Sequence, residues 1–149
     1  MFCAFCSTCH VQVEFSRALS LQDGRNKPDV VAPGTVASAA AGKACGVAVF
    51  RGTSMATPIV AGSAVLVRQY FMQGFYPTGQ ATKGHEFEPS GALVKAVIIG
   101  GATPLSGFTE AGLPLEPTPS RRQGYGRVTL SQSLPIGGSN QDWRMQVGN

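Results

Sequence analysis

The strongest constraint on folding in this chain is an apolar stretch that follows Pro58. Residues 59–61 and 64–67 are all apolar, and at helical spacing they cover almost the whole circumference of a helix. Polar residues return at Arg68 and Gln69, and Gly74 supplies a stop signal. We therefore expect a helix over residues 54–72 that is buried on most sides, as in the centre of an α/β domain.

The composition supports a folded, loop-rich domain rather than a disordered or membrane-spanning chain. Hydrophobic residues make up 43% of the 149 residues and charged residues 13%, whereas disordered chains are polar and highly charged. The 19 glycines and 10 prolines indicate many constrained turns. The longest mostly apolar run, residues 55–67, is shorter than the ~20 residues that a bilayer requires, so we predict no membrane span.

The basic residues do not indicate a nucleic-acid site. The net charge is +4, and the densest basic spot is Arg121, Arg122 and Arg127. No aromatic residues alternate with these arginines in the manner of a nucleic-acid surface. We favour a solvated loop and expect no nucleic-acid partner.

The rest of the chain predicts short elements joined by loops. Residues 29–32 and 47–50 read as short strands, separated by a small-residue stretch from Ala37 to Gly46. A second helix is expected to start at Ser90, a good N-cap, and to end at Gly100-Gly101. Loops are expected over residues 75–89 and 103–120, and a last short element over 129–134.

The cysteines leave several alternatives open. Cys3, Cys6 and Cys9, with His10 beside them, have the spacing of a metal clip. No second ligand pair follows them, so the alternatives are an atypical or non-native leader, or thiols that pair with missing sequence. Cys45 is either a buried thiol or half of a disulfide. We predict no metal site and no cofactor.

The motif Gly52-Thr53-Ser54-Met55-Ala56-Thr57-Pro58 stands where the expected helix begins. Unpaired N–H groups and the positive end of the helix dipole favour negative charge there. Pro58 has no N–H and cannot bond the carbonyl of Ser54, so the first turn is loosened at that residue. A Thr-Ser pair before a helix is usually a plain N-cap.

The complete motif, followed by residues 59–62, resembles the serine motif of the subtilase family. Three further segments match in order: residues 23–34 resemble the family's turn and strand, 89–96 its next helix, and 123–128 its closing segment. The resemblance covers about residues 15–135. It implies an α/β, partial subtilisin-like fold, with a remnant of a parallel sheet and a buried nucleophile helix.

The resemblance divides the chain into three parts. Residues 1–14 are a divergent or non-native lead-in, 15–135 the C-terminal portion of a subtilase catalytic domain, and 136–149 a polar tail. It implies a serine-type endopeptidase that acts on polypeptides, with Ser54 as nucleophile and its backbone N–H as oxyanion donor. Gly52 and Thr53 are expected to contact substrate. A secreted or membrane-associated parent fits the family, although the sequence does not place the protein in a compartment.

The aspartate and histidine motifs of the family are missing. The family order is Asp, His, Ser; His10 matches nothing in the histidine motif, and His85 follows Ser54. Asp23 and Asp29 belong to the turn-and-strand segment. We therefore expect the chain to be incomplete as a peptidase, with the missing N-terminal part of the domain as a partner. The alternative is a non-catalytic subtilase fragment or a binding or structural protein.

Overall fold

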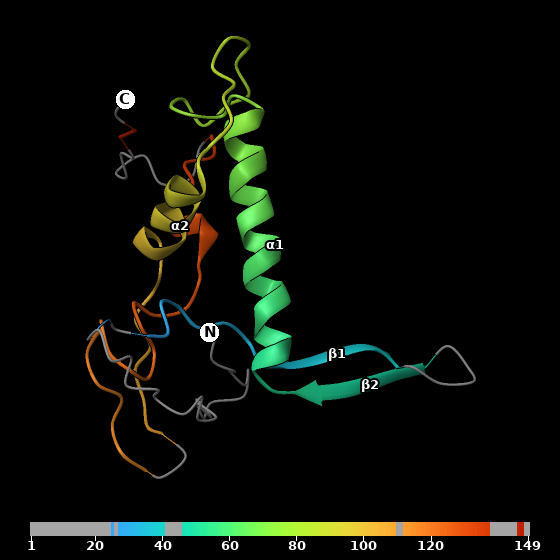
Figure 1. Cartoon of the computed structure of the whole chain (residues 1–149), viewed down its shortest axis with the longest axis vertical. Coiled ribbons are helices and arrows are strands. Elements are labelled where there is room, and N and C mark those ends of the chain that lie inside the picture. Colours follow the sequence, from blue (N-terminus) through green and yellow to red (C-terminus); the bar gives the residue numbers. More distant parts are fainter. Residues whose placement is uncertain (1–24, 26, 41–45, 110–111, 138–145, 148–149) are drawn as a thin grey trace. The chain divides into compact units, whose positions relative to one another are not determined.

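The computed structural model describes residues 25, 27–40, 46–109, 112–137 and 146–147 (Figure 1). In chain order, the elements are strand β1 (Thr35–Ala40), strand β2 (Gly46–Arg51), helix α1 (Thr53–Met72), helix α2 (Gly91–Gly100) and the 3₁₀ helix η1 (Leu130–Gln132). The chain forms two compact units. Unit 1 contains Met1–Val60 and Pro104–Arg127, and unit 2 contains Ala61–Thr103 and Val128–Asn149. The combination of helices and a sheet confirms a small α/β protein.

The sheet of unit 1 is a two-stranded antiparallel hairpin. Thr35 lies opposite Arg51, and Ala40 opposite Gly46. Strands joined by a short connection pair in this way, whereas parallel strands need a crossover of about a dozen residues or more. The predicted parallel sheet is therefore wrong for the described residues. Their parallel pairing is limited to the single bridge between Val31 and Arg127.

The first strand also lies further along the chain than predicted. The segment 29–32 is reduced to the bridge at Val31, and β1 instead occupies residues 35–40, which lie mostly in the small-residue stretch. Small side chains suffice there because β1 is held by its ladder with β2 and leaves its side chains largely exposed. The predicted second strand, 47–50, is confirmed within β2.

Helix α1 confirms the predicted helix but not its predicted burial. Its buried residues are Ala56, Val60, Val67, Tyr70 and Phe71. Ala56, Val60, Val67 and Phe71 are four or seven residues apart, and Tyr70 follows Val67 by three, so the five positions form a single stripe along the helix. Val65 and Leu66 remain 64% and 53% exposed. The prediction that the nucleophile helix is buried on most sides is therefore wrong, because the described structure covers only one face of α1.

In unit 2, helix α2 has the predicted ends. The Ser90 hydroxyl accepts a hydrogen bond from the backbone N–H of Leu93 at 3.2 Å, which satisfies one of the free donors of the first turn. The N–H of Gly101 bonds the carbonyl of Val97 at 3.2 Å and closes the last turn. Neither described helix is long and apolar enough to cross a membrane.

Aromatic side chains form the core of unit 2. Phe71 is fully buried, and its ring centroid lies 5.0 Å from that of Phe87 and 5.9 Å from that of Tyr76. The hydroxyl of Tyr70 donates to the carbonyl of Pro135 at 2.8 Å. These contacts hold the end of α1 against the loops that follow it.

Unit 1 has a smaller core around Val31. Val31 is 2% exposed, and Leu105 and Leu115 pack against it. Its N–H donates to the carbonyl of Gly126 at 2.9 Å. The segment that leads into β1 is thereby fixed to the segment 123–127.

Candidate active site at the Ser54 turn

The chain turns sharply at Gly52, between β2 and α1. Gly52 has φ +139°, a conformation that residues with a side chain rarely adopt. Its N–H donates to the carbonyl of Gly34 at 2.8 Å, and its carbonyl accepts from the N–H of Met55 at 3.1 Å. The turn is thus anchored on one side to the start of β1 and on the other to the first turn of α1.

Ser54 is the second residue of α1, and it is exposed. Ala56, two residues on, is fully buried, so the helix presents Ser54 outward while Ala56 faces the protein. The Ser54 hydroxyl contacts the thioether sulfur of Met55, with an Oγ–Sδ distance of 3.2 Å. A thioether is a weak acceptor and does not take up a proton at neutral pH. Within the described residues, the hydroxyl is therefore accessible but is not paired with a base.

Two backbone donors lie beside this hydroxyl. The first N–H groups of a helix have no partner within the helix. Among the described residues, the N–H groups of Thr53 and Ser54 have no hydrogen-bond acceptor. These two donors and the positive end of the helix dipole can stabilise a negative oxygen that forms near Ser54.

In the first turn of α1, the carbonyls of Thr53 and Ser54 do not follow the ordinary helical hydrogen-bond pattern. The hydroxyl of Thr57 donates to the carbonyl of Thr53 at 3.0 Å. Pro58 lies inside the helix and has no N–H for the carbonyl of Ser54. The loosening of the turn at Ser54 stays a prediction.

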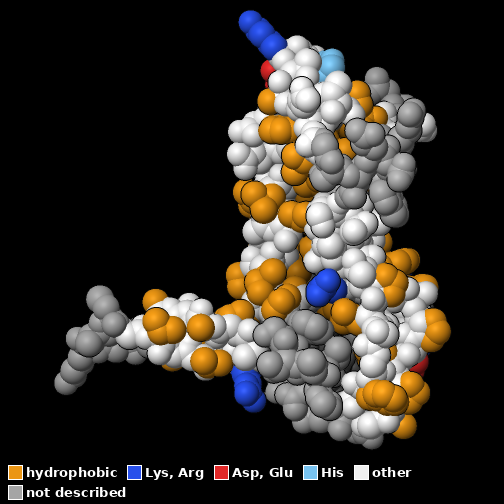
Figure 2. Space-filling model, turned by 180° about the vertical axis from the view of Figure 1, so that it is seen from behind, with side chains coloured by type: hydrophobic (Ala, Val, Ile, Leu, Met, Phe, Trp, Pro, Cys, Tyr) orange, Lys and Arg blue, Asp and Glu red, His pale blue; other side chains and the backbone are white. Residues whose placement is uncertain are grey.

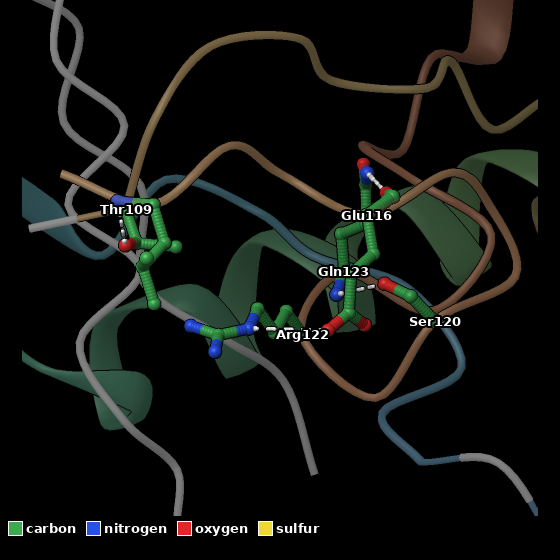
Figure 3. Close-up of polar contacts among 6 residues, drawn as sticks. Thr109, Glu116, Ser120, Arg122 and Gln123 are labelled. Carbon is green, nitrogen blue, oxygen red and sulfur yellow. Dashed lines mark hydrogen bonds and ion pairs between the residues drawn. The ribbon is translucent and has the colours of Figure 1, made fainter. Parts of the chain in front are cut away.

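A buried glutamine holds together the loops of unit 1 (Figure 3). Gln123 is 1% exposed. Its side-chain oxygen accepts from the N–H of Leu105 at 2.8 Å, and its side-chain nitrogen donates to the carbonyls of Leu105 and Glu116 at 3.2 Å and 2.8 Å. Its own N–H donates to the hydroxyl of Ser120 at 3.3 Å. One side chain thus closes the proline-rich loop on itself.

Hydrogen bonds connect this glutamine to the Ser54 turn. The residues after Gln123 pair with the segment before β1, because the N–H of Tyr125 donates to the carbonyl of Asp29 at 2.9 Å. Gly124 makes that close approach feasible, since a Cβ there would lie 2.3 Å from the carbonyl oxygen of Asp29. The segment before β1 ends at Gly34, whose carbonyl accepts the hydrogen bond from the N–H of Gly52.

The other candidate residues are not brought to Ser54 by the described structure. His10, Asp23 and all four cysteines lie outside the described residues, so the alternatives for the cysteines remain untested. Asp29 is ion-paired with Lys27. His85 is exposed and belongs to unit 2. No group of three metal-ligating side chains occurs within the described ranges.

The sequence pointed to the Ser54 turn but not to the residues that support it. Gln123 appeared only as the first residue of the closing segment, and nothing in its neighbours distinguishes a buried glutamine from an exposed one. Gly34 appeared as the last residue of the segment 23–34, without its bond to Gly52. The one available signal was the pair of glycines after Gln123, which indicates tight backbone geometry.

Comparison with known proteins gives matches over most of this chain. A model of the subtilase family matches residues 7–126. The chain is 32% identical over 151 aligned residues to the Dictyostelium discoideum serine protease/ABC transporter B family protein tagD, covering 82% of this chain and 8% of that protein. It is 35% identical to tagB of the same organism, over 62% of this chain and 6% of that protein. The chain thus spans less than a tenth of the length of these relatives. No solved structure gives a significant match.

Proposed function

The chain belongs to the subtilase family, and we propose that it is part of a serine-type endopeptidase in which Ser54 is the nucleophile. The Ser54 oxygen attacks the carbonyl carbon of a peptide bond and loses its proton to a base. The tetrahedral intermediate then collapses: the peptide C–N bond breaks, and the amine leaves with the proton that the base had taken. Water hydrolyses the remaining acyl-enzyme ester and regenerates the Ser54 hydroxyl. The observation that carries the proposal is the exposed Ser54 hydroxyl beside two backbone donors without acceptors among the described residues.

Each residue of the turn has a role in this proposal. The N–H of Ser54 donates to the oxyanion of the tetrahedral intermediate, and the N–H of Thr53 is available to the same oxygen or to a neighbouring substrate carbonyl. Gly52 lets the substrate backbone approach, because glycine has no side chain of its own. The polypeptide is the substrate.

The base and its supporting carboxylate are proposed to come from polypeptide outside the described residues, with the N-terminal part of the catalytic domain as the source. The described contact of the Ser54 hydroxyl is a thioether, which cannot act as the base. In subtilisin itself, loss of the histidine lowers kcat by about 2 × 10⁶-fold. We therefore expect no measurable peptide hydrolysis from the described part of the chain acting alone.

The test is chemical rescue of Ser54 labelling. The purified chain is incubated with a fluorophosphonate probe over a series of imidazole concentrations, because imidazole can replace a missing histidine side chain. Trypsin cleavage after Arg51 and Arg68 releases residues 52–68, in which fragmentation separates Ser54 from Ser63. Labelling of Ser54 is expected to rise with imidazole and to vanish in Ser54→Ala.

Ser106→Ala is the matched control, since Ser106 is also exposed and lies in unit 1. This substitution should leave labelling of residues 52–68 unchanged. If Ser54 reacts no faster than Ser106 at every imidazole concentration, the proposed donors do not activate it. The non-catalytic alternative would then be the better description.

A further inference from the structure

The outer edge of β2 has backbone groups that point away from its partner. The bond from the N–H of Gly52 to the carbonyl of Gly34 makes these two residues a hydrogen-bonded pair of the ladder. Because such pairs alternate along antiparallel strands, the N–H and C=O groups of Val47, Val49 and Arg51 face outward. Within the described part of the chain, no backbone group pairs with them.

The same three residues have exposed side chains, and so does Phe50, whose position in the strand places it on the opposite face. Val47 and Val49 are 76% and 65% exposed, and Arg51 is also exposed. Their spacing of two residues places all three on one face of the hairpin. Hydrophobic side chains are visible along the hairpin in Figure 2. An apolar strand with free backbone groups is prone to accept another strand.

The charge at this edge favours an acidic occupant. The two carboxylates in the described part of unit 1 are already paired, Asp29 with Lys27, and Glu116 with Arg122 at 3.7 Å. Arg51 has no acidic partner among the described residues. The chain as a whole carries a net charge of +4, which opposes association with a second copy.

We propose that the outer edge of β2 binds an extended, acidic polypeptide segment, which adds to the hairpin as a third strand. Main-chain hydrogen bonds to Val47, Val49 and Arg51 supply the affinity, and apolar side chains of the ligand cover the two valines. A carboxylate of the ligand pairs with the Arg51 guanidinium. This docking surface does not depend on the chemistry of Ser54.

The test measures peptide binding by fluorescence anisotropy, using the full chain with Ser54→Ala so that cleavage cannot consume the probe. The probe is a labelled, blocked peptide of alternating valine and threonine with a glutamate at each end. A second peptide carries glutamine in place of glutamate. A third carries N-methyl groups on alternate amides and cannot form the strand ladder.

The glutamate peptide is expected to bind about 1.5- to 5-fold more tightly than the glutamine peptide, the range for an exposed ion pair. Arg51→Gln should remove that difference, whereas Arg121→Gln, which removes an exposed arginine elsewhere in unit 1, should preserve it. The N-methylated peptide should lose at least about tenfold in affinity, because the main-chain bonds supply most of the binding.

Three results would overturn the proposal. The first is equal affinity of the glutamate and glutamine peptides for the native edge. The second is an N-methylated peptide that binds as tightly as the unmethylated one. The third is a dimer, detected by light scattering, that the peptide does not dissociate. The last result would assign the edge to a second copy of the chain. None of these outcomes bears on the labelling of Ser54, so the two proposals can fail separately.

Discussion

Replacement of Gln123 by leucine should loosen unit 1 with little change in side-chain volume. The substitution removes the acceptor for the N–H of Leu105 and the donor for the carbonyls of Leu105 and Glu116. A buried polar group left without a partner costs about 1–3 kcal/mol. Since Leu105 is half-buried and Glu116 is exposed, water compensates part of the loss. We expect local destabilisation of about 2–4 kcal/mol, a large share of the ~5–15 kcal/mol that stabilises a typical domain.

Amide hydrogen exchange measures this effect at the affected site. A destabilisation of about 2–4 kcal/mol corresponds to about 30- to 1,000-fold faster exchange of the Leu105 N–H, if exchange proceeds through local opening. Gln69→Leu is the control, because Gln69 is exposed on α1 and its side chain makes no hydrogen bond within the described structure. Exchange at Leu105 within threefold of the native rate in Gln123→Leu would refute the argument that this side chain holds the loop.

Two further predictions follow from the contacts of each unit. Gly124→Ala should destabilise unit 1 by about 2–5 kcal/mol, because φ is +57° and the new Cβ would meet the carbonyl oxygens of Pro28 and Asp29. The control is Gly112→Ala, at φ +75° but with open space around it, which should cost only about 1–2 kcal/mol. Denaturant unfolding measures both losses of stability, and equal losses in the two variants would contradict the clash at Gly124. In unit 2, burial raises the pKa of Tyr70, and the negative charge of Tyr76 raises it further. The folded protein therefore holds the Tyr70 proton more tightly than the unfolded chain does. The contribution of this proton to the stability of the fold is complete below pH 10.0 and is lost as the pH rises through the raised pKa. A phenolate absorbance step above pH 10.0 should disappear in Tyr70→Phe, and a Tyr70 step at or below that pH would contradict the assignment.

Local sequence signals predicted the helices well. The N-cap at Ser90 and the glycines after Ile99 set the two ends of α2. The hydrogen bonds at each end join residues that are only a few positions apart in the chain. The apolar stretch after Pro58 predicted α1, because apolar residues at helical spacing and few strong breakers favour a helix over most of that length. Such signals depend only on neighbours in the chain, and the printed sequence contains all of them.

Signals that depend on distant partners were harder to read. The extent of burial of α1 depends on what lies against it, so Val65 and Leu66 were expected to be buried although they are exposed. The strand at residues 35–40 has small side chains and little strand propensity, and its ladder with β2 decides its conformation. The expected parallel sheet came from family resemblance rather than from the residues themselves.

The candidate site shows the same division. The motif from Gly52 to Pro58 identified Ser54 as a hydroxyl at the start of a helix, because glycine, serine and proline have local backbone effects that can be read in order. Its supports could not be read in this way. Gly34 lies 18 positions before Gly52 and Gln123 lies 18 positions after Leu105, and only folding brings each pair within hydrogen-bonding distance.

The sequence by itself therefore determined the family, the two helices and the place of Ser54 at the beginning of α1. Those features rest on residue order and local backbone preference. The tertiary structure decided that the hairpin is antiparallel, that α1 is covered along one face, and that Ser54 is exposed with a thioether beside its hydroxyl. Burial, strand partners and side-chain contacts depend on segments far apart in the chain, so folding alone can assign them.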